Sequence, residues 1–360
     1  MRIVHITAAR RAGQGSTFGG LERFFEEIIP AQRALGLEVG VLEVAAEALS
    51  AAADAISRHD WIGVSEIGCD LLGTANADIF HLHDWYGSIA FEHLYRRGCR
   101  ALVVSSHLPL RRGFTYRDTG LGWQAKSIIE NRCLQAAPVI TAPSNYAKRF
   151  LIEEYGLSGD RLNVVPHGVD CSTFSPCGGP FIAEPPRLLA VGRLTEQKGF
   201  ELLIRAFPLV LTTEPAARLT IVGDGGRRAA LSRMIADLNL AGIVTILDAK
   251  SKPELARIFS DTTLLIIPSQ FEPFGLVGLE AMACGCPVLA IAPTGASEYL
   301  ESEELTNSYS IARLAQAICR RIQALRQQQG PRSLVRLRAR EWSWERAASA
   351  YRDLYSGCIG

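Results

Sequence analysis

Short apolar runs alternate with helix-like intervals along most of the chain, and this alternation constrains the fold more than any other feature. Residues 3–7 form one such run, and Leu21, Phe24, Ile28 and Ile29 follow it at helical spacing. Parallel strands joined by helices are buried on both faces and are therefore continuously apolar. The sequence predicts an α/β fold whose parallel sheets are covered by helices on both faces.

The alternation occurs in two series that are separated by a stretch of turn-forming residues. Glycine and proline accumulate at 178–186, where the periodicity stops, so we place a linker there between a domain at 1–177 and a domain at 187–338. Two doubly wound, Rossmann-like halves bind ligands in the cleft at the carboxyl ends of their strands. The expected strands are 3–7, 38–44, 79–82, 101–105, 139–141 and 163–165 in the first half, and 188–191, 219–222, 244–247, 263–267 and 288–291 in the second.

Composition excludes several classes of function. The chain has 360 residues, enough for two domain cores, and its net charge of +1 shows no basic excess of the kind that a nucleic-acid groove requires. Nine cysteines without a Cys-x-x-Cys pair indicate reduced thiols and a cytoplasmic protein. We expect no leader and no membrane-spanning segment, while a weak peripheral membrane contact stays open. The sequence indicates no oligomeric state.

The segment 268–285 places two carboxylates around the start of a helix. Glu272 precedes the predicted helix and Glu280 lies inside it, so eight helical steps would separate them by roughly 12 Å. That distance suits a ligand extending from a sugar across a diphosphate to a ribose. The backbone amides of Phe274, Gly275 and Leu276 would face the diphosphate, because the first amides of a helix have no partner within the helix.

Two cations follow the first strand of the second half. Arg193 and Lys198 emerge at the carboxyl end of that strand, where an arginine fork and a lysine point charge could neutralise a departing nucleoside diphosphate without a metal ion. The chain has no Asp-x-Asp pair, which favours a metal-independent site. A strand-end turn that carries two solvated cations would explain the same residues.

Glycines occupy two further strand-end loops. Gly19 and Gly20 end the long loop before the first helix and would let the backbone approach an anion, although a ligand-free surface loop explains them equally well. Gly223 follows the strand at 219–222, where a base could stack on the backbone or an ordinary turn could form.

Histidines end two strands of the first half. His81 and His83 share one strand face by the period of two, and His107 follows the strand at 101–105. The spacing lacks a zinc-binding His-Glu-x-x-His pattern, so we assign no metal, and each histidine alone is more often structural than catalytic. Their position at the carboxyl ends of strands nevertheless favours a site.

Taken together, these motifs resemble the retaining glycosyltransferases of family four, which have the two-domain GT-B fold. The resemblance covers nearly the whole chain and rests on Glu272 to Glu280 in their Pro-Phe-Gly context, Arg193 with Lys198-Gly199, the Gly19-Gly20 loop, and 142–144 with 165–170.

The resemblance implies a role for each motif. Glu272 would contact the donor sugar and Glu280 the ribose, while Arg193 and Lys198 would hold the diphosphate. His107 is similar to the histidine near the transferred sugar. The segment His83-Asp84-Trp85 is similar to the acceptor side of bacterial glycogen and starch synthases, and the helix at 339–360 to one that packs back on the first domain.

The expected activity is transfer of a hexose from a nucleoside-diphosphate sugar, with UDP-glucose as the first guess, to a glycan or lipid-linked acceptor. The sugar nucleotide is a co-substrate, and no cofactor is implied. The chain departs from the family after Glu298, where residues 301–310 run quickly into a helix and shorten one edge of the second domain. This departure leaves open a non-catalytic protein that binds sugar nucleotides. A sugar-nucleotide 2-epimerase of the same fold is a second alternative.

Overall fold

A computed structural model describes residues 1–8, 20–110, 121–177, 184–327 and 332–359. Its contacts divide these residues into two compact units. The first contains 1–8, 24–166 and 345–359, and the second contains 20–23 and 167–344. The division thus falls between Pro166 and His167, and the last helix of the chain returns to the first unit. The expected linker at 178–186 lies mostly outside the described residues.

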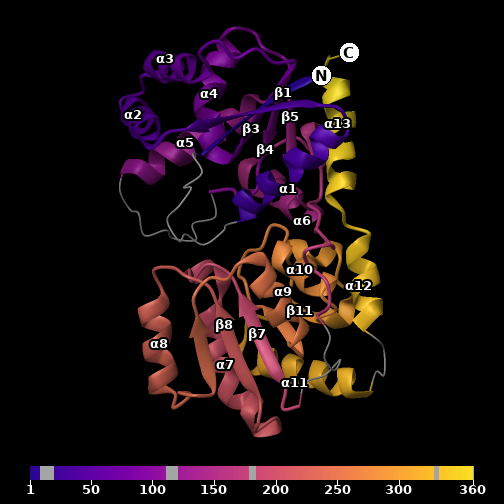
Figure 1. Ribbon diagram of the computed structural model, residues 1–360. Helices are drawn as coiled ribbons and strands as arrows, with labels where there is room; N and C mark the ends of the chain where they lie inside the picture. Colours follow the sequence, from indigo (N-terminus) through magenta and orange to yellow (C-terminus); the bar gives the residue numbers. More distant parts are fainter. Residues whose placement is uncertain (9–19, 111–120, 178–183, 328–331, 360) are drawn as a thin grey trace. The chain divides into compact units, whose positions relative to one another are not determined.

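The first unit is built on a six-stranded parallel sheet with the order β2-β1-β3-β4-β5-β6 (Figure 1). All six predicted strands of this half are present. Helices α2 to α5 lie on one side of the sheet, and α1 and α13 lie on the other. The strands are β1 (Arg2–Ala8), β2 (Glu38–Val44), β3 (Ile79–His83), β4 (Leu102–Ser105), β5 (Val139–Ala142) and β6 (Leu162–Val164). The helices are α1 (Gly20–Ala34), α2 (Ala46–Ser57), α3 (Trp61–Leu72), α4 (Asp84–Arg96), α5 (Leu121–Ala136), α6 (Asn145–Tyr155) and α13 (Trp344–Ile359).

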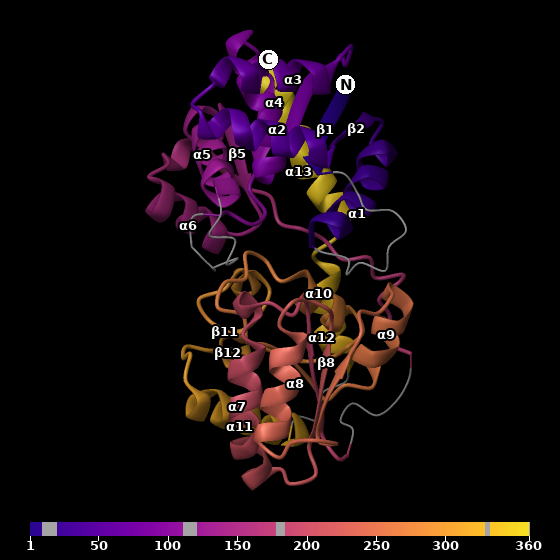
Figure 2. The same ribbon diagram turned by 90° about the vertical axis from the view of Figure 1, so that its left-hand side faces the viewer.

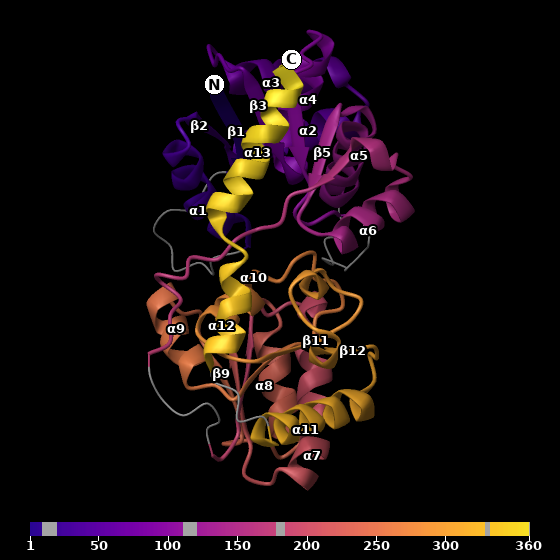
Figure 3. The same ribbon diagram turned by 90° about the vertical axis from the view of Figure 1, so that its right-hand side faces the viewer.

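Strand register in the first sheet brings polar side chains together on the face that α13 covers (Figure 3). His5 of β1 pairs with His81 of β3, and His83 pairs with Ser105 of β4. Side chains of alternate residues point to one face of a strand, so His81 and His83 share a face as predicted. Tyr351 and Tyr355 of α13 are buried on the same face, where they contact these groups.

The second unit repeats the architecture with the strand order β12-β11-β10-β7-β8-β9 (Figure 2). The five predicted strands are present as β7 (Arg187–Val191), β8 (Arg218–Val222), β9 (Val244–Leu247), β10 (Leu264–Ile267) and β11 (Val288–Ile291), together with a sixth, β12 (Leu305–Thr306), that the sequence did not reveal. Its helices are α7 (Phe200–Thr213), α8 (Arg228–Asp237), α9 (Lys252–Ser260), α10 (Leu276–Ala283), α11 (Ile311–Gln327) and α12 (Arg332–Arg340).

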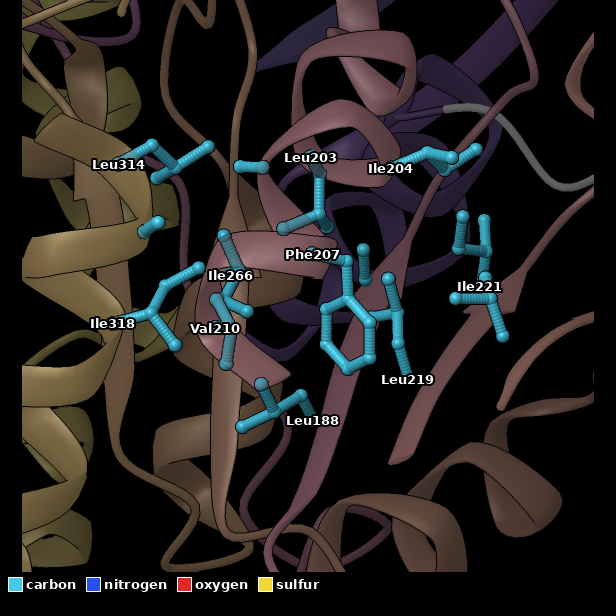
Figure 4. Close-up of a cluster of buried hydrophobic side chains, with 14 of the residues drawn as sticks. Leu188, Leu203, Ile204, Phe207, Val210, Leu219, Ile221, Ile266, Leu314 and Ile318 are labelled. Carbon is cyan, nitrogen blue, oxygen red and sulfur yellow. The ribbon is translucent and has the colours of Figure 1, made fainter. Parts of the chain in front are cut away.

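Two buried clusters flank the second sheet. On one face, Phe207 and Val210 of α7 and Ile318 of α11 pack against strand residues such as Leu188 and Leu219 (Figure 4). The other face packs against α9, α10 and α12 and contains the buried thiols of Cys284 and Cys286. Helix α9 begins with a capping box, in which the backbone N–H of Ser251 donates to the Glu254 carboxylate at 2.9 Å.

Within the described ranges, no helix is long and apolar enough to cross a lipid bilayer.

Candidate functional site

Two loops meet at the carboxyl edge of the second sheet. The loop 192–199 follows β7 and the loop 268–275 follows β10, and these strands are neighbours in the sheet. The backbone N–H of Gln270 donates to Gln197 O at 2.8 Å, and the buried Gln197 Nε2 donates to Phe271 O at 2.9 Å. Hydrogen bonds therefore join the loop that carries Arg193 and Lys198 to the loop that carries Glu272.

Lys198 and Glu272 form an ion pair between these loops. Lys198 Nζ lies 2.7 Å from Glu272 Oε2, and the side chains are 19% and 9% exposed. The Ser269 hydroxyl donates to the same carboxylate oxygen at 3.0 Å. An ammonium group has three N–H donors, so Lys198 can bind Glu272 and a ligand oxygen together. Arg193 lies half-buried in the same loop as Lys198.

Glycines allow the backbones at this edge to approach closely. Gly199 has φ +68°, and a Cβ atom there would lie 1.9 Å from Pro268 O. A Cβ atom at Gly223 would lie 1.9 Å from Gly192 O. Packing of the main chain thus explains Gly223 without a ligand, and contact with a base stays a prediction.

The structure places Glu272 before α10 and Glu280 within it, as the segment 268–285 predicts. Gly275 caps the helix with φ +85°, and Glu272 and Glu280 are both buried. The buried Phe274 ring packs edge-on against Tyr299, with centroids 5.7 Å apart. Contact between a ligand and Phe274 would therefore use the backbone amide of this residue.

Tyr299 is a functional candidate that sequence reasoning missed. Its hydroxyl donates to Gly275 O at 2.6 Å, which fixes the turn that opens α10. Burial raises the pKa of Tyr299, and the nearby charges of Glu272 and Glu280 raise it further. Because Tyr299 lies beside both carboxylates, we infer that it holds the helix start in register with them. Its position 24 residues from Gly275 gave no local signal.

In the first unit, His81 and His83 lie in a buried hydrogen-bond network. His81 Nδ1 contacts the Tyr355 hydroxyl and His81 Nε2 contacts Ser105 Oγ, both at 2.7 Å. His83 Nε2 lies 2.8 Å from His5 Nδ1, and His83 Nδ1 lies 2.9 Å from His107 Nε2. Burial lowers the pKa of His81 well below its usual value, with the charges of His5 and His107 adding to the effect. The buried network therefore favours neutral His81.

Nitrogen atoms of His5, His81 and His83 all lie within 4.8 Å of one another, a spacing compatible with a metal ion. Both ring nitrogens of each histidine already have a hydrogen-bond partner: His5 Nε2 contacts Gln32 Oε1 at 2.9 Å, and the other contacts are those just described. A metal ion would have to replace these bonds, so the arrangement favours a hydrogen-bond network over a metal centre. His5 escaped sequence reasoning, although a histidine within an apolar strand was a usable signal.

His107 is held through its main chain and its side chain. Asp84 Oδ1 accepts from the backbone N–H of His107 at 2.7 Å and of Leu108 at 3.2 Å, while His83 contacts the ring of His107. Burial raises the pKa of Asp84 to about 6 against the opposing effect of these two bonds, and burial lowers the pKa of His107 to about 3. The adjacent residues His83 and Asp84 thus both position His107.

Three predicted contacts remain, at Trp85, Gly20 and Gly19. Trp85 is half-buried, and Lys126 Nζ lies 4.9 Å from the centre of its ring, a cation–π contact. Gly20 begins α1, and a Cβ atom there would meet nothing within 4 Å. Gly19 is not among the described residues.

Glu130 of α5 lies near enough to Asp84 for the two charges to interact, and its burial predicts how stability depends on pH. Its carboxylate accepts from the backbone N–H of Leu110 at 3.0 Å and from the Tyr155 hydroxyl. Burial raises its pKa from 4.5 to about 8, and the Asp84 charge adds to the rise. The folded state therefore keeps a proton that the unfolded chain loses, so stability should fall as pH rises from about 4.5 to about 8.

We expect Glu130→Gln to remove this contribution. Chemical unfolding measures the free energy of unfolding at pH 5 and at pH 8. Between these pH values it should fall more for the wild type than for the variant, by on the order of 2 kcal/mol. Glu66→Gln, at an exposed position of α3, should behave like the wild type. Equal pH dependence in all three proteins would contradict a raised pKa at Glu130.

Comparison with known proteins identifies both halves of the chain. Residues 18–173 match the family model described as Glycosyltransferase Family 4, and residues 179–341 match the model described as Glycosyl transferases group 1. A D-inositol 3-phosphate glycosyltransferase of Pseudarthrobacter chlorophenolicus is 31% identical over 236 residues, which cover 61% of this chain and 56% of that protein. A glycogen synthase of Thermus thermophilus is 26% identical over 332 residues, which cover 79% and 74%. The chain spans 42% to 62% of the length of the first three curated relatives.

Solved structures share the fold along the whole chain. Sucrose-phosphate synthase from Thermosynechococcus elongatus superposes with a TM-score of 0.80 at 20% identity and 99% coverage of both chains. The Anabaena protein HepE, in complex with UDP and glucose, superposes with a TM-score of 0.74 at 18% identity, covering 99% of this chain and all of that one. The chain therefore has the GT-B fold, and its two halves belong to the family-four and group 1 glycosyltransferase domain families.

Proposed function

We propose that this protein transfers a hexose from a nucleoside-diphosphate sugar to a hydroxyl group of a glycan or lipid-linked acceptor, with retention at the anomeric carbon and without a metal ion. The observation that carries this proposal is the Lys198–Glu272 ion pair at the carboxyl edge of the second sheet. In this pair the cation that we propose for the diphosphate contacts the carboxylate that we propose for the sugar. The GT-B fold and the glycosyltransferase relatives support the same activity.

Residues of the second unit would bind the diphosphate, the sugar and the ribose of the sugar nucleotide. Arg193 and Lys198 would neutralise the diphosphate, and Glu272 would accept hydrogen bonds from sugar hydroxyls. Glu280, within α10, would accept from the ribose. The first amides of α10 would donate to the diphosphate, because the start of a helix attracts anions. Two cations and a helix start can hold a leaving diphosphate without a metal ion.

The chemical step would depend on electrostatic stabilisation of the leaving group. As the bond to the anomeric carbon breaks, negative charge grows on the phosphate oxygen, and that oxygen takes the proton of the acceptor hydroxyl on the same face of the sugar. Lys198 and Arg193 would stabilise this charge more in the transition state than in the bound donor.

In the first unit, His107 would contact the transferred sugar, and His83, Asp84 and Trp85 would form the acceptor side. We expect the enzyme to act in the cytoplasm, where a weak peripheral contact would give it lipid-linked acceptors.

The test is a screen of nucleoside-diphosphate sugars by thermal shift, because a ligand that binds the folded state raises its unfolding temperature. UDP-glucose is the first candidate, since HepE was solved with UDP-glucose. Glu280→Ala should abolish most of the shift, while Glu254→Ala, at an exposed glutamate of α9, should preserve it.

Donors that bind are then incubated with chelator and an acceptor panel, and the anomeric configuration of the product is read by NMR. Transfer with retention in chelator supports the proposal, whereas inversion or loss of transfer in chelator contradicts the mechanism. An epimerised donor formed without acceptor would establish a 2-epimerase. Binding with neither reaction would indicate a non-catalytic sugar-nucleotide-binding protein.

A further inference from the structure

A pocket of about 450 Å³ lies in the first unit where α4 and α5 end, and these two helices pack against each other. Small-molecule sites have volumes of about 300–1,000 Å³. Arg100 and Pro138 line the pocket, and they lie just before β4 and β5. His107 instead follows the carboxyl end of β4. Because the strands are parallel, the pocket and His107 lie at opposite edges of the sheet, so the pocket is separate from the candidate site.

Three arginines and one glutamate set the charge of this pocket. Arg96, Arg100 and Arg132 line it together with Glu92, and three positive charges with one negative charge leave a net charge of +2. Glu92 is buried and holds two of the arginines: Arg96 Nε donates to Glu92 Oε1 at 2.7 Å, and Arg132 Nε donates to Glu92 Oε2 at 2.8 Å. Burial raises the pKa of Glu92, but the hydrogen bonds from Arg132 and Arg96 outweigh burial and lower the pKa. The ionised carboxylate therefore fixes two guanidinium groups at the pocket.

The three arginines keep most of their donors for a ligand. A guanidinium group has five N–H donors in a planar fork that matches a phosphate group. The bonds to Glu92 use one donor of Arg96 and two of Arg132, and these side chains are 45% and 43% exposed. The exposed side chain of Arg100 has no hydrogen bond or ion pair with any residue that the structure describes. An anion in the pocket could therefore bind to all three.

The ends of the two helices account for only part of this arrangement. The carboxyl end of a helix carries about half a negative charge, which favours cations and opposes anions. This effect explains Arg96 in the last turn of α4, and the ion pair with Glu92 explains Arg132. Neither explains Arg100, which lies in the connection before β4. The two helix ends together add about one negative charge, so the pocket stays positive.

We propose that this pocket binds the phosphate group of a small phosphorylated molecule through the guanidinium groups of Arg96, Arg100 and Arg132. A phosphate monoester has a charge of about −1.5 to −2 at pH 7, which matches the excess of positive charge. Tyr95, which also lines the pocket, offers a ring for the organic part of the ligand: it is 48% exposed and stacks on Phe91 with centroids 5.3 Å apart. Such binding is independent of the proposed transfer of a hexose.

Fluorine NMR of the protein labelled with fluorotryptophan tests the pocket locally. The Arg132 guanidinium lies 4.4 Å from the centre of the Trp61 ring, so Trp61 reports a ligand that binds to Arg132. The chain has five tryptophans, and the signal of Trp61 is the one lost in Trp61→Phe. At constant ionic strength, phenyl phosphate should shift this signal until it saturates, whereas phenol should not. A Trp61 signal that does not shift, or that shifts without saturating, would overturn the proposal.

Arg100→Met is the deciding variant, because Arg100 has no partner within the described residues and its replacement should leave the fold intact. The affinity for phenyl phosphate should fall about tenfold or more, the effect of lost hydrogen bonds to a charged group. The control is Arg97→Met, which removes the same charge from an exposed neighbour of Arg96 that does not line the pocket. It should bind like the wild type. Unchanged affinity in Arg100→Met, or an equal loss in both variants, would refute the site.

Inorganic phosphate separates the two parts of the ligand. It should shift the Trp61 signal but bind more weakly than phenyl phosphate, because it has no ring to pack on Tyr95. Tyr95→Ala should bring the two affinities together while inorganic phosphate binds as before. A difference that persists in Tyr95→Ala would contradict the contact with Tyr95, and inorganic phosphate that binds as tightly as phenyl phosphate to the wild type would overturn the assignment to an organic phosphate.

Discussion

Replacing Lys198 with methionine is expected to lower kcat for glycosyl transfer by about 10²- to 10³-fold while weakening donor binding much less. The Lys198 ammonium contacts Glu272, the carboxylate proposed to bind the donor sugar, at 2.7 Å. Its proposed charge stabilisation grows as the diphosphate leaves, so the loss should appear mainly in the chemical step. Rates at saturating donor and donor affinity by titration separate the two effects.

A stability effect must be separated from this loss of rate. Lys198→Met also leaves the buried Glu272 carboxylate without its cationic partner, and breaking a buried ion pair costs about 3–5 kcal/mol. The double variant with Glu272→Gln should recover much of that stability and stay slow. Lys250→Met is the matched control, because Lys250 pairs with Glu254 at 3.7 Å with Glu254 half exposed, and it should leave the rate unchanged. Normal turnover per bound donor in Lys198→Met would refute the proposed role of the cation.

Replacing Gly199 with alanine is expected to destabilise the second unit by about 2–5 kcal/mol. The added Cβ would lie 1.9 Å from Pro268 O and 2.4 Å from the Tyr309 hydroxyl, and the residue keeps φ +68°. A left-handed backbone costs a non-glycine residue about 1–2 kcal/mol, and the overlap with main-chain atoms costs about 1–3 kcal/mol more. The loops that carry Lys198 and Glu272 would have to separate, so transfer should also be lost.

Thermal unfolding measures the change, with an expected fall in unfolding temperature of about 4–20 °C. Gly226→Ala provides the comparison, since a Cβ there meets nothing within 4 Å and its φ lies outside the left-handed region. It should change the unfolding temperature by little. A stable, active Gly199→Ala protein would show that the contact between the two loops is not required.

Local features of the fold could be predicted from the sequence because they depend on neighbouring residues. Continuous apolar runs marked eleven of the twelve strands that the described residues form. The two-residue strand β12 escaped prediction because so short a segment has no periodicity and is defined by its pairing with β11. The shortened edge after Glu298 therefore still completes a six-stranded sheet.

The sequence predicted the charged residues of the candidate site in the second unit. It did not reveal the buried residues that position such groups through contacts remote in the sequence. Glu272, Glu280 and Lys198 stand in patterned loops, whereas Gln32 and Tyr299 contribute through partners that are remote in the sequence. Gln32 contacts Tyr355 across 323 positions of the chain. No local pattern reports such a contact, because it depends on which helix covers which face of the sheet.

By itself, the amino-acid sequence determined the two α/β halves, the placement of Glu272 and Glu280 around a helix start, and the resemblance to glycosyltransferases. Only the tertiary structure decided that Lys198 pairs with Glu272 and that His5, His83 and His107 form one hydrogen-bond chain. The physical reason is that side-chain periodicity specifies strands and helices locally, while strand order and register specify which polar groups meet.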